Sequence, residues 1–154
     1  MSREQPKPAM TGRDIALRLL EIINRSEWDS LGEVLADDVV IEWRQSGERI
    51  RGLANARSVF SSYPGEQPDR FGNELEFVEG DEDRFIITPS FTMIRAEGVG
   101  DSVTSTVRTI YPDGAVWYIV NLAKLRSGKI VYMVQYFAPA YDAPDWRAQW
   151  VEPM

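Results

Sequence analysis

Two primary amides stand in strand-like runs that are otherwise apolar. Asn121 lies in the run VWYIVNLAKL, and Gln135 lies in the run KIVYMVQYFA. An amide buried among such neighbours needs hydrogen-bond partners, because leaving it unpaired costs on the order of 1–3 kcal/mol. Its NH2 group can also donate to a carbonyl or enol oxygen of a ligand. Two interpretations therefore stay open: the amides bond to one another or to water in the core, or they orient a ligand.

A carboxylate, Glu42, is the third candidate for chemistry. It stands between Ile41 and Trp43, so strict alternation along a strand turns it outward, away from the side of Trp43. On that pattern a surface salt bridge is the expectation. A β-bulge that shifted the register would instead make Glu42 a general base beside a pocket. We take Gln135, Asn121 and Glu42 as the candidate catalytic residues.

The composition of the 154-residue chain excludes several kinds of chemistry. It contains no Cys and no His, which removes thiolate catalysis, disulfides, histidine metal ligands and imidazole acid–base catalysis. Its 24 acidic and 17 basic residues give a net charge of −7, which argues against a nucleic-acid or anionic-membrane partner. No run approaches the ~20 apolar residues of a membrane span, and no phosphate loop or nucleophile motif is present. We expect a cytoplasmic protein that uses no cofactor and no metal.

Helical periodicity dominates the first part of the chain. Residues 1–10 carry two prolines and little apolar material, and we interpret them as a flexible leader. Thr11 is a candidate N-cap, with Asp14 in the capping-box position, for an amphipathic helix. A second, shorter helix capped by Ser26 is expected to extend to residue 35, and a third is expected over residues 53–63.

Short strand-like segments flank the third helix and fill the second half of the chain. The segments 39–43 and 49–51 are joined by a turn at Ser46-Gly47. Later strand candidates, where the apolar period becomes two, are 74–79, 84–96, 103–111, 115–125 and 129–137. A last short helix is expected at 145–150. Helices followed by antiparallel strands indicate an α+β domain over residues 11–138, and we expect the tail 139–154 to pack on the pocket mouth or on a dimer partner.

Two glycine-containing loops determine which side chains share a face of the sheet. Pro112-Asp113-Gly114 and Arg126-Ser127-Gly128 each predict a three-residue connection, which sets Asn121 opposite Met133. One face then carries Trp117, Ile119, Asn121, Met133, Gln135 and Phe137, and the other carries Tyr118, Val120, Leu122, Tyr132, Val134 and Tyr136. Both faces are rich in apolar residues. We expect the first to cover the helices and a cavity, and the second to meet another copy of the chain in a homodimer.

Three segments carry a resemblance to a known superfamily. LADDVVIEW, SGERIRGLANARSVF and GKIVYMVQYFA resemble sequences of ketosteroid isomerases and SnoaL-like polyketide cyclases, which share the fold of nuclear transport factor 2. The resemblance covers roughly residues 12–138. It implies a cone-shaped α+β barrel in which three N-terminal helices pack in a strongly curved, mainly antiparallel sheet around a deep apolar pocket. It also implies dimerisation through the outer face of the sheet.

The same resemblance shows where this chain departs from its relatives. The general-base Asp of ketosteroid isomerases corresponds to Trp43, their tyrosine donor to Leu19 and their second, protonated Asp to Asn121. The acid/base Asp of SnoaL-like cyclases corresponds to Gln135, and a His two positions earlier corresponds to Met133. The familiar ionisable groups are therefore absent, and neither mechanism transfers intact.

These observations define a candidate site and leave two functions open. The candidate ligand-binding residues are Leu19, Trp43, Trp117, Ile119, Met133 and Phe137, and the expected ligand is a small, apolar, oxygenated molecule. The first function is a cofactor-independent isomerase, cyclase or dehydratase that works with amides and ordered water. The alternative is a non-catalytic binding or carrier module. A carboxylate or a Tyr hydroxyl reaching the cavity is the feature that separates them.

Overall fold

Helices and strands occur in the order expected of an α+β protein. The computed structural model describes residues 10–63, 76–79, 84–87, 91–99, 101–111 and 113–154. The helical segments in these ranges are α1 (Gly12–Asn24), α2 (Leu53–Ser61) and the 3₁₀ helices η1 (Trp28–Glu33) and η2 (Asp145–Trp150). The strands are β1 (Leu35–Trp43), β2 (Glu48–Arg51), β3 (Glu76–Glu79), β4 (Arg84–Ile87), β5 (Phe91–Val99), β6 (Ser102–Ile110), β7 (Val116–Arg126) and β8 (Lys129–Pro139).

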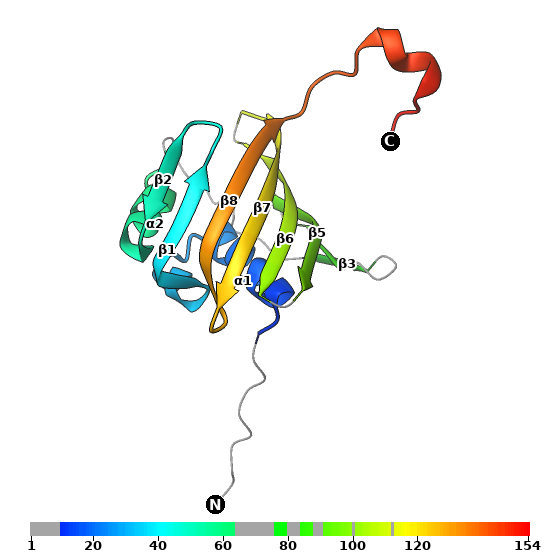
Figure 1. The fold of residues 1–154 in the computed structure, drawn as a ribbon. Coiled ribbons are helices and arrows are strands. Elements are labelled where there is room, and N and C mark those ends of the chain that lie inside the picture. The colour runs from blue at the N-terminus through cyan, green and yellow to red at the C-terminus, as the bar shows by residue number, and fades with distance from the viewer. Residues whose placement is uncertain (1–9, 64–75, 80–83, 88–90, 100, 112) are drawn as a thin grey trace, which may run out of the picture.

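One curved sheet contains all of the described strands (Figure 1). Their order is β2-β1-β8-β7-β6-β5-β4-β3. β1 and β8 pair in parallel, and the other pairs are antiparallel. The predicted α+β fold with a curved, mainly antiparallel sheet is therefore confirmed. The leader expected at residues 1–10 lies, except for Met10, outside the described residues.

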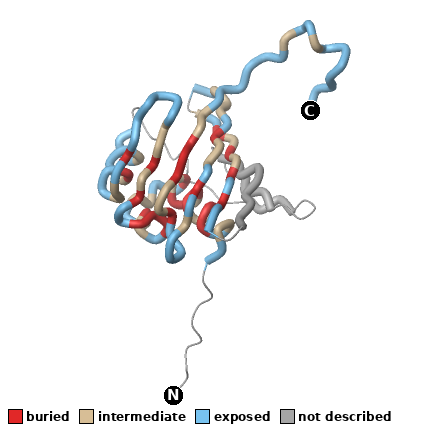
Figure 2. The backbone as a smooth tube through the Cα atoms, viewed as in Figure 1, coloured by how far each residue is buried: buried red, intermediate tan, exposed pale blue. Residues whose placement is uncertain are grey.

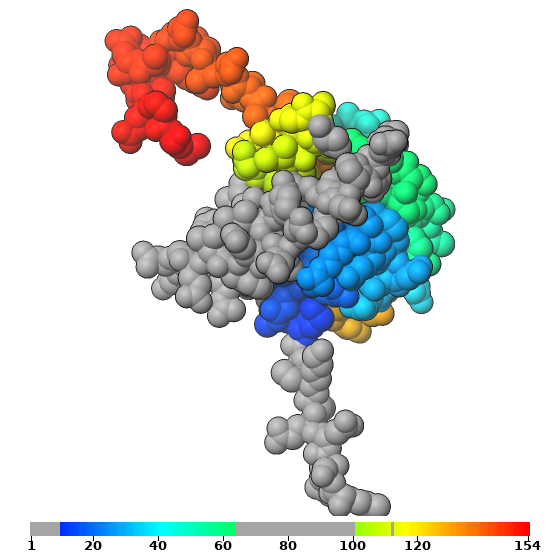
Figure 3. Space-filling view, turned by 180° about the vertical axis from the view of Figure 1, so that it is seen from behind, coloured from blue at the N-terminus to red at the C-terminus, as the bar shows by residue number. Residues whose placement is uncertain are grey.

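The helix α1 forms as its sequence predicts. The side chain of Thr11 accepts a hydrogen bond from the Asp14 N–H, and the Asp14 side chain accepts one from the Thr11 N–H, which completes the capping box. The buried stripe of α1 consists of Ile15, Ala16, Leu19, Leu20 and Ile22, with Asn24 at its end. This stripe packs in one core with buried residues of β1, β6, β7 and β8. Seen from behind, the N-terminal helical segments lie at the surface on that side of the molecule (Figure 3).

The second helix is shorter than predicted and of a different type. η1 ends at Glu33, β1 already begins at Leu35, and Ser26 has a φ of 53° instead of capping the helix. The apolar residues Trp28, Leu31 and Val34 are spaced by three, which matches the three residues per turn of a 3₁₀ helix. The prediction of a helix through residue 35 was wrong for this reason.

The predicted strand 84–96 is in fact two strands. β4 and β5 are antiparallel neighbours, with Ile86 paired to Met93. Pro89 lies between them in the sequence, and a proline cannot donate to the hydrogen-bond ladder of a continuous strand. Residues 88–90 themselves lie outside the described part of the chain.

The connection between β7 and β8 is shorter than the predicted three-residue loop. The loop has two residues, because Arg126 pairs with Lys129 while Ser127 and Gly128 adopt φ values of 51° and 76°. A β-bulge between the pairs Leu125–Ile130 and Lys124–Tyr132 then shifts the register once more.

The bulge restores the faces that the sequence predicts. Asn121 lies opposite Gln135, two residues beyond the predicted partner Met133. Because side chains alternate along a strand, an offset of two residues changes the partner and preserves the face. The two predicted faces of β7 and β8 therefore hold, although the predicted pairs were wrong.

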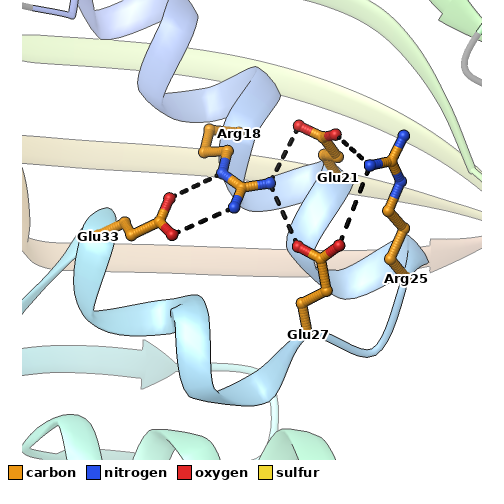
Figure 4. A network of polar contacts seen from close by, with 5 residues as sticks. All are labelled: Arg18, Glu21, Arg25, Glu27 and Glu33. Atoms are coloured by element: carbon orange, nitrogen blue, oxygen red, sulfur yellow. Dashed lines mark hydrogen bonds and ion pairs between the residues drawn. The ribbon is translucent and has the colours of Figure 1, made fainter.

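A network of ion pairs attaches η1 to α1 (Figure 4). Arg18 contacts Glu33 through Nε at 2.9 Å, Glu21 through Nη1 at 3.1 Å and Glu27 through Nη1 at 3.3 Å. The hydrogen bond to Glu33 holds the pKa of Arg18 above its usual range. Arg25 completes the network by pairing with Glu21 at 2.8 Å. One guanidinium thus gathers carboxylates from α1, from η1 and from the turn between them.

We predict that Arg18→Met destabilises the protein by about 1–2 kcal/mol, because it leaves three carboxylates facing one another on a partly covered surface. The side chain of Arg18 is 23% exposed, whereas that of Arg25 is 50% exposed. The matched variant Arg25→Met should therefore cost less than about 0.5 kcal/mol. Urea unfolding of the two variants beside the wild type measures the difference, and equal losses would contradict a central role for Arg18.

Candidate functional site

Four side chains form a chain of hydrogen bonds across the concave face of the sheet. The Trp43 indole Nε1–H donates to Gln135 Oε1 at 2.7 Å. The Gln135 Nε2 donates to Asn121 Oδ1 at 2.8 Å, and the Asn121 Nδ2 donates to Ser105 Oγ at 3.1 Å. We call Trp43, Gln135, Asn121 and Ser105 the amide relay. It spans β1, β8, β7 and β6, four strands that are adjacent in the sheet.

Strand register brings the members of the amide relay together. Asn121 pairs directly with Gln135 across β7 and β8, and with Ser105 across β7 and β6. Beyond the end of β1, the side chain of Gln45 continues the pairing with β8: its Nε2 donates to the Phe137 C=O, and its Oε1 accepts from the Phe137 N–H. The rings of Phe137 and Trp43 are nearly perpendicular, at 84°, with a centroid distance of 6.0 Å.

The amide relay has a fixed direction. An indole N–H can only donate, so the oxygen of Gln135 must face Trp43 and its NH2 group must face Asn121. The same logic turns the oxygen of Asn121 towards Gln135 and its NH2 group towards Ser105. Each amide oxygen therefore already accepts one hydrogen bond within the amide relay. Within the described part of the chain, no acceptor is recorded for the second N–H of each amide or for the O–H of Ser105, so these groups remain as donors.

Two adjoining cavities lie beside the amide relay and share the residues Ile23, Ile119 and Gln135. The inner cavity, of about 50 Å³, lies between the sheet and α1 and includes Leu19, Ser105, Asn121 and Met133 in its wall. The outer cavity, of about 190 Å³, includes Trp28, Trp43, Tyr63, Thr109, Tyr111 and Phe137 in its wall. Most of the described lining is apolar.

Most of the residues predicted to bind a ligand meet at these cavities. Leu19 and Met133 line the inner cavity, Trp43 and Phe137 line the outer cavity, and Ile119 lines both. The two candidate catalytic amides also line the inner cavity, and Gln135 reaches the outer one as well.

Trp117 is set apart from the other predicted ligand-binding residues. It belongs to neither of the described linings; its ring instead lies nearly perpendicular to the Tyr111 ring, at a centroid distance of 6.0 Å. Trp117 thus stands behind a residue of the cavity wall.

Glu42 lies on the other face of the sheet, as strict alternation indicates. Its carboxylate bonds to Arg44 at 3.1 Å and to Arg49 at 2.9 Å. A hydrogen bond from Tyr132, reinforced by both arginines, lowers the pKa of Glu42 below its usual value of 4.5. The register of β1 does shift, but between Leu35 and Val40, and Glu42 stays outside both described linings.

Several lining residues were not among the predicted site residues. Ser105 is 5% exposed and Thr109 is 1% exposed on the inner side of β6. The Tyr111 N–H donates to the Ala115 C=O, which is the register that the predicted three-residue connection implies, so the same counting could have placed Ser105 opposite Asn121. No comparable signal pointed to Tyr63 and Tyr111, whose rings stack at 6.0 Å from α2 and β6 ends that are remote in sequence.

Other kinds of site have little support in the described part of the chain. Its residues contain no group of three or more His, Cys, Asp or Glu able to hold a metal ion. None of its helices is long and apolar enough to cross a membrane.

The curved sheet packed on helices, the apolar cavities and the amide relay together are typical of cone-shaped α+β pocket proteins. Residues 16–133 match the family model of the SnoaL-like domain, so the chain belongs to the SnoaL-like family. A comparison with curated proteins found no match.

Solved structures give the same fold. A nuclear transport factor 2-like protein of unknown function from Burkholderia xenovorans is 27% identical, with a TM-score of 0.71 over 92% of this chain and 94% of that chain. A candidate ketosteroid isomerase from Kribbella flavida is 23% identical, with a TM-score of 0.69 over 93% and 89%. An LEH-like epoxide hydrolase from Mycobacterium tuberculosis is 17% identical, with a TM-score of 0.53 over 80% of each chain.

The amide relay makes a prediction about stability. Trp43→Phe keeps an aromatic ring beside Phe137 but removes the only donor that bonds Gln135 Oε1 among the described residues. We expect a loss of about 1–3 kcal/mol in the free energy of unfolding, because a buried acceptor is left unpaired. The control Trp117→Phe removes an indole outside the amide relay and should cost clearly less. Similar losses in the two variants, measured by urea unfolding, would mean that the bond to Gln135 contributes little.

Proposed function

We propose that this protein binds a small, apolar molecule with an oxygen that accepts hydrogen bonds, and that the ligand occupies the cavities beside the amide relay. The observation that carries the proposal is the direction of that relay. Each of its amide oxygens already accepts one hydrogen bond, whereas no described residue is recorded as accepting from the second N–H of either amide, so the amide relay offers a ligand mainly donors. A carbonyl, ether or epoxide oxygen complements such a surface, and the apolar walls complement the remainder of the ligand.

The polar groups of the inner wall make an apolar ligand without oxygen a poor match. Gln135 is 9% exposed and Ser105 is 5% exposed, so water has limited access to them. A ligand that displaces their water without offering an acceptor leaves these donors unpaired. Binding and selectivity for an oxygenated ligand therefore have one physical origin.

Catalysis is the second candidate function. Donors aimed at a ligand oxygen can stabilise negative charge that develops there, as in an isomerase, a cyclase or a dehydratase. Tyr63 and Tyr111 in the wall of the outer cavity favour this candidate, because a phenol can donate or accept a proton. Against it, no carboxylate belongs to the described lining of either cavity. The Kribbella flavida and Mycobacterium tuberculosis structures are named as a candidate ketosteroid isomerase and an epoxide hydrolase, so the support they give to catalysis is an analogy of fold alone.

The first test compares two probes of similar size and shape, a cyclic ketone and the matching cyclic hydrocarbon. In the wild type the ketone should bind more tightly, by about five- to fiftyfold, because it alone uses the donors. Gln135→Leu should remove most of that preference and leave the affinity for the hydrocarbon within about threefold of the wild-type value. Quenching of Trp fluorescence by the probes reports both affinities, since Trp28 and Trp43 lie in the outer wall.

The control variant for this test is Ser58→Ala, a polar-to-apolar change on the exposed side of α2 that should alter neither affinity. If the wild type binds neither probe, the proposed pocket function fails. If both probes bind equally well, the pocket exists but the amide relay does not select its ligand.

The second test is the pH dependence of ketone binding, which we expect to change less than about twofold between pH 6 and pH 8. The chain has no His, and amides do not titrate. The pKa of Glu42 is lowered by Tyr132 and its arginines, so its contribution to stability is present above the unfolded value of 4.5 and is lost only as pH falls below it. A bell-shaped profile near neutrality would instead require a titrating group in the cavity.

A further inference from the structure

The C-terminal segment 140–154 exposes large apolar side chains away from the domain. Tyr141 is 77% exposed, and Trp146 and Trp150 are each 72% exposed. The segment leaves the end of β8 and stands clear of the sheet in both views (Figures 1 and 3), and its exposed surface is evident in Figure 2. Such a concentration of exposed aromatic surface is typical of an interaction site.

The segment has too little structure to be stable in isolation. η2 spans six residues of 3₁₀ helix, and its N-cap residue Pro144 makes no side-chain hydrogen bond. Isolated helices of this length are unstable in water, because few hydrogen bonds offset the entropy of ordering the chain. A surface that covers Trp146 and Trp150 would supply the missing stability.

The convex face of the sheet offers an apolar surface. At its centre Tyr118 is 38% exposed and Leu122 is 43% exposed, and the half-buried Val120, Tyr132 and Tyr136 adjoin them. Val134, which the sequence places on the same face, is only 4% exposed because its own chain already covers it. The surface available to another molecule is therefore centred on β7.

The charges of the two surfaces are complementary. Strand pairing places Arg51, Arg108 and Lys124 on the convex face. The acidic Glu42 there is already paired with two arginines, and Asp38 is paired with Arg126. This face is thus basic on a chain whose net charge is −7. The C-terminal segment is acidic, with Asp142, Asp145 and Glu152 against Arg147.

The direction of the chain indicates which copy receives the segment. The Ala140 N–H donates to the Val116 C=O at 2.8 Å, which holds the end of β8 in line with the sheet. Pro144 is extended, with φ −71° and ψ 142°, and the segment continues outward from there (Figure 1). To cover its own convex face the chain would have to reverse within residues 140–144, whereas a neighbouring copy needs no such reversal.

We propose that the C-terminal segment of one chain docks on the convex face of a second copy, with Trp146 and Trp150 against Tyr118 and Leu122, and that the second copy returns the same contact. The acidic residues of the segment then lie near Arg51, Arg108 and Lys124 of the receiving face. The exchange connects each outer cavity to the dimer, because Phe137 in the cavity wall lies on β8 two residues before that strand ends at Pro139 and the segment begins.

A mixing experiment with two full-length variants tests the exchange. Trp146→Ser/Trp150→Ser disables the segment, and Leu122→Glu disables the face. In sedimentation velocity the wild type should be dimeric, and each variant alone should have a dissociation constant raised at least about tenfold. An equimolar mixture of the two variants should recover dimers, because the intact segment of one chain fits the intact face of the other.

Met10→Glu serves as a control, since Met10 is 40% exposed and outside both surfaces; it should leave the dimer unchanged. Three results would overturn the proposal: a wild type that stays monomeric at about 100 μM, a Trp146→Ser/Trp150→Ser variant that dimerises like the wild type, or a mixture that recovers no dimer. The last result would also be expected if the segment covered its own pocket mouth.

The absence of Cys from the chain permits an independent measurement. Chains carrying Ala148→Cys in the segment are mixed with chains carrying Thr104→Cys on the convex face, and a short bis-maleimide is added. Cross-linked dimers that contain one chain of each kind are expected. Asn55→Cys, exposed on α2, replaces Thr104→Cys in the control and should give no such product. Equal cross-linking at the two positions would overturn the proposal without relying on variants that weaken the dimer.

Discussion

The pairing of β7 with β8 is the constraint on which the candidate site depends. It sets Asn121 opposite Gln135, and the pairing of β7 with β6 adds Ser105. A register one residue away would turn one member of each pair towards solvent and leave the other unpaired in the core. The two-residue turn at Ser127-Gly128 alone would produce that register, and the bulge between Lys124 and Leu125 corrects it. The bulge is therefore part of the site, although it lies several residues from the amides.

The sequence predicted the faces of this sheet better than its details. Alternation along β7 and β8 depends only on local spacing, so the concave set with Asn121 and Gln135 could be recognised without the correct loop. The length of the loop could not be predicted in this way. Ser127 adopts a positive φ, which is unfavourable for Ser and which the surrounding structure must maintain. The helix expected to end at residue 35 failed for a different reason, since a spacing of three fits one turn of α-helix and of 3₁₀ helix alike. Tyr63 and Tyr111 meet only through the tertiary fold, which no local pattern reveals.

Amides at positions 121 and 135 behave differently from ionisable groups at the same places. A carboxylate in place of Gln135 or Asn121 would bind or release a proton, and its charge would depend on the pH and on the ligand. An amide carries no charge, but its orientation must be chosen, because its two ends have opposite hydrogen-bonding character. Trp43 makes that choice for the whole amide relay. In this chain the indole N–H thus determines which ends of the two amides carry the donors that face the cavities.

The two faces of the sheet are both rich in apolar residues, but they accommodate their polar groups in different ways. On the concave face, the two amides and Ser105 satisfy part of their hydrogen-bonding capacity through one another, and their remaining donors face the apolar cavities. On the convex face, Glu42 is neutralised by arginines from the same chain, and the surface beyond it stays apolar and basic. β8 takes part in both, because Gln135 faces the cavity while its neighbours Val134 and Tyr136 face outward. Movement of this strand by a partner on the convex face would therefore act directly on the amide that connects Trp43 to Asn121.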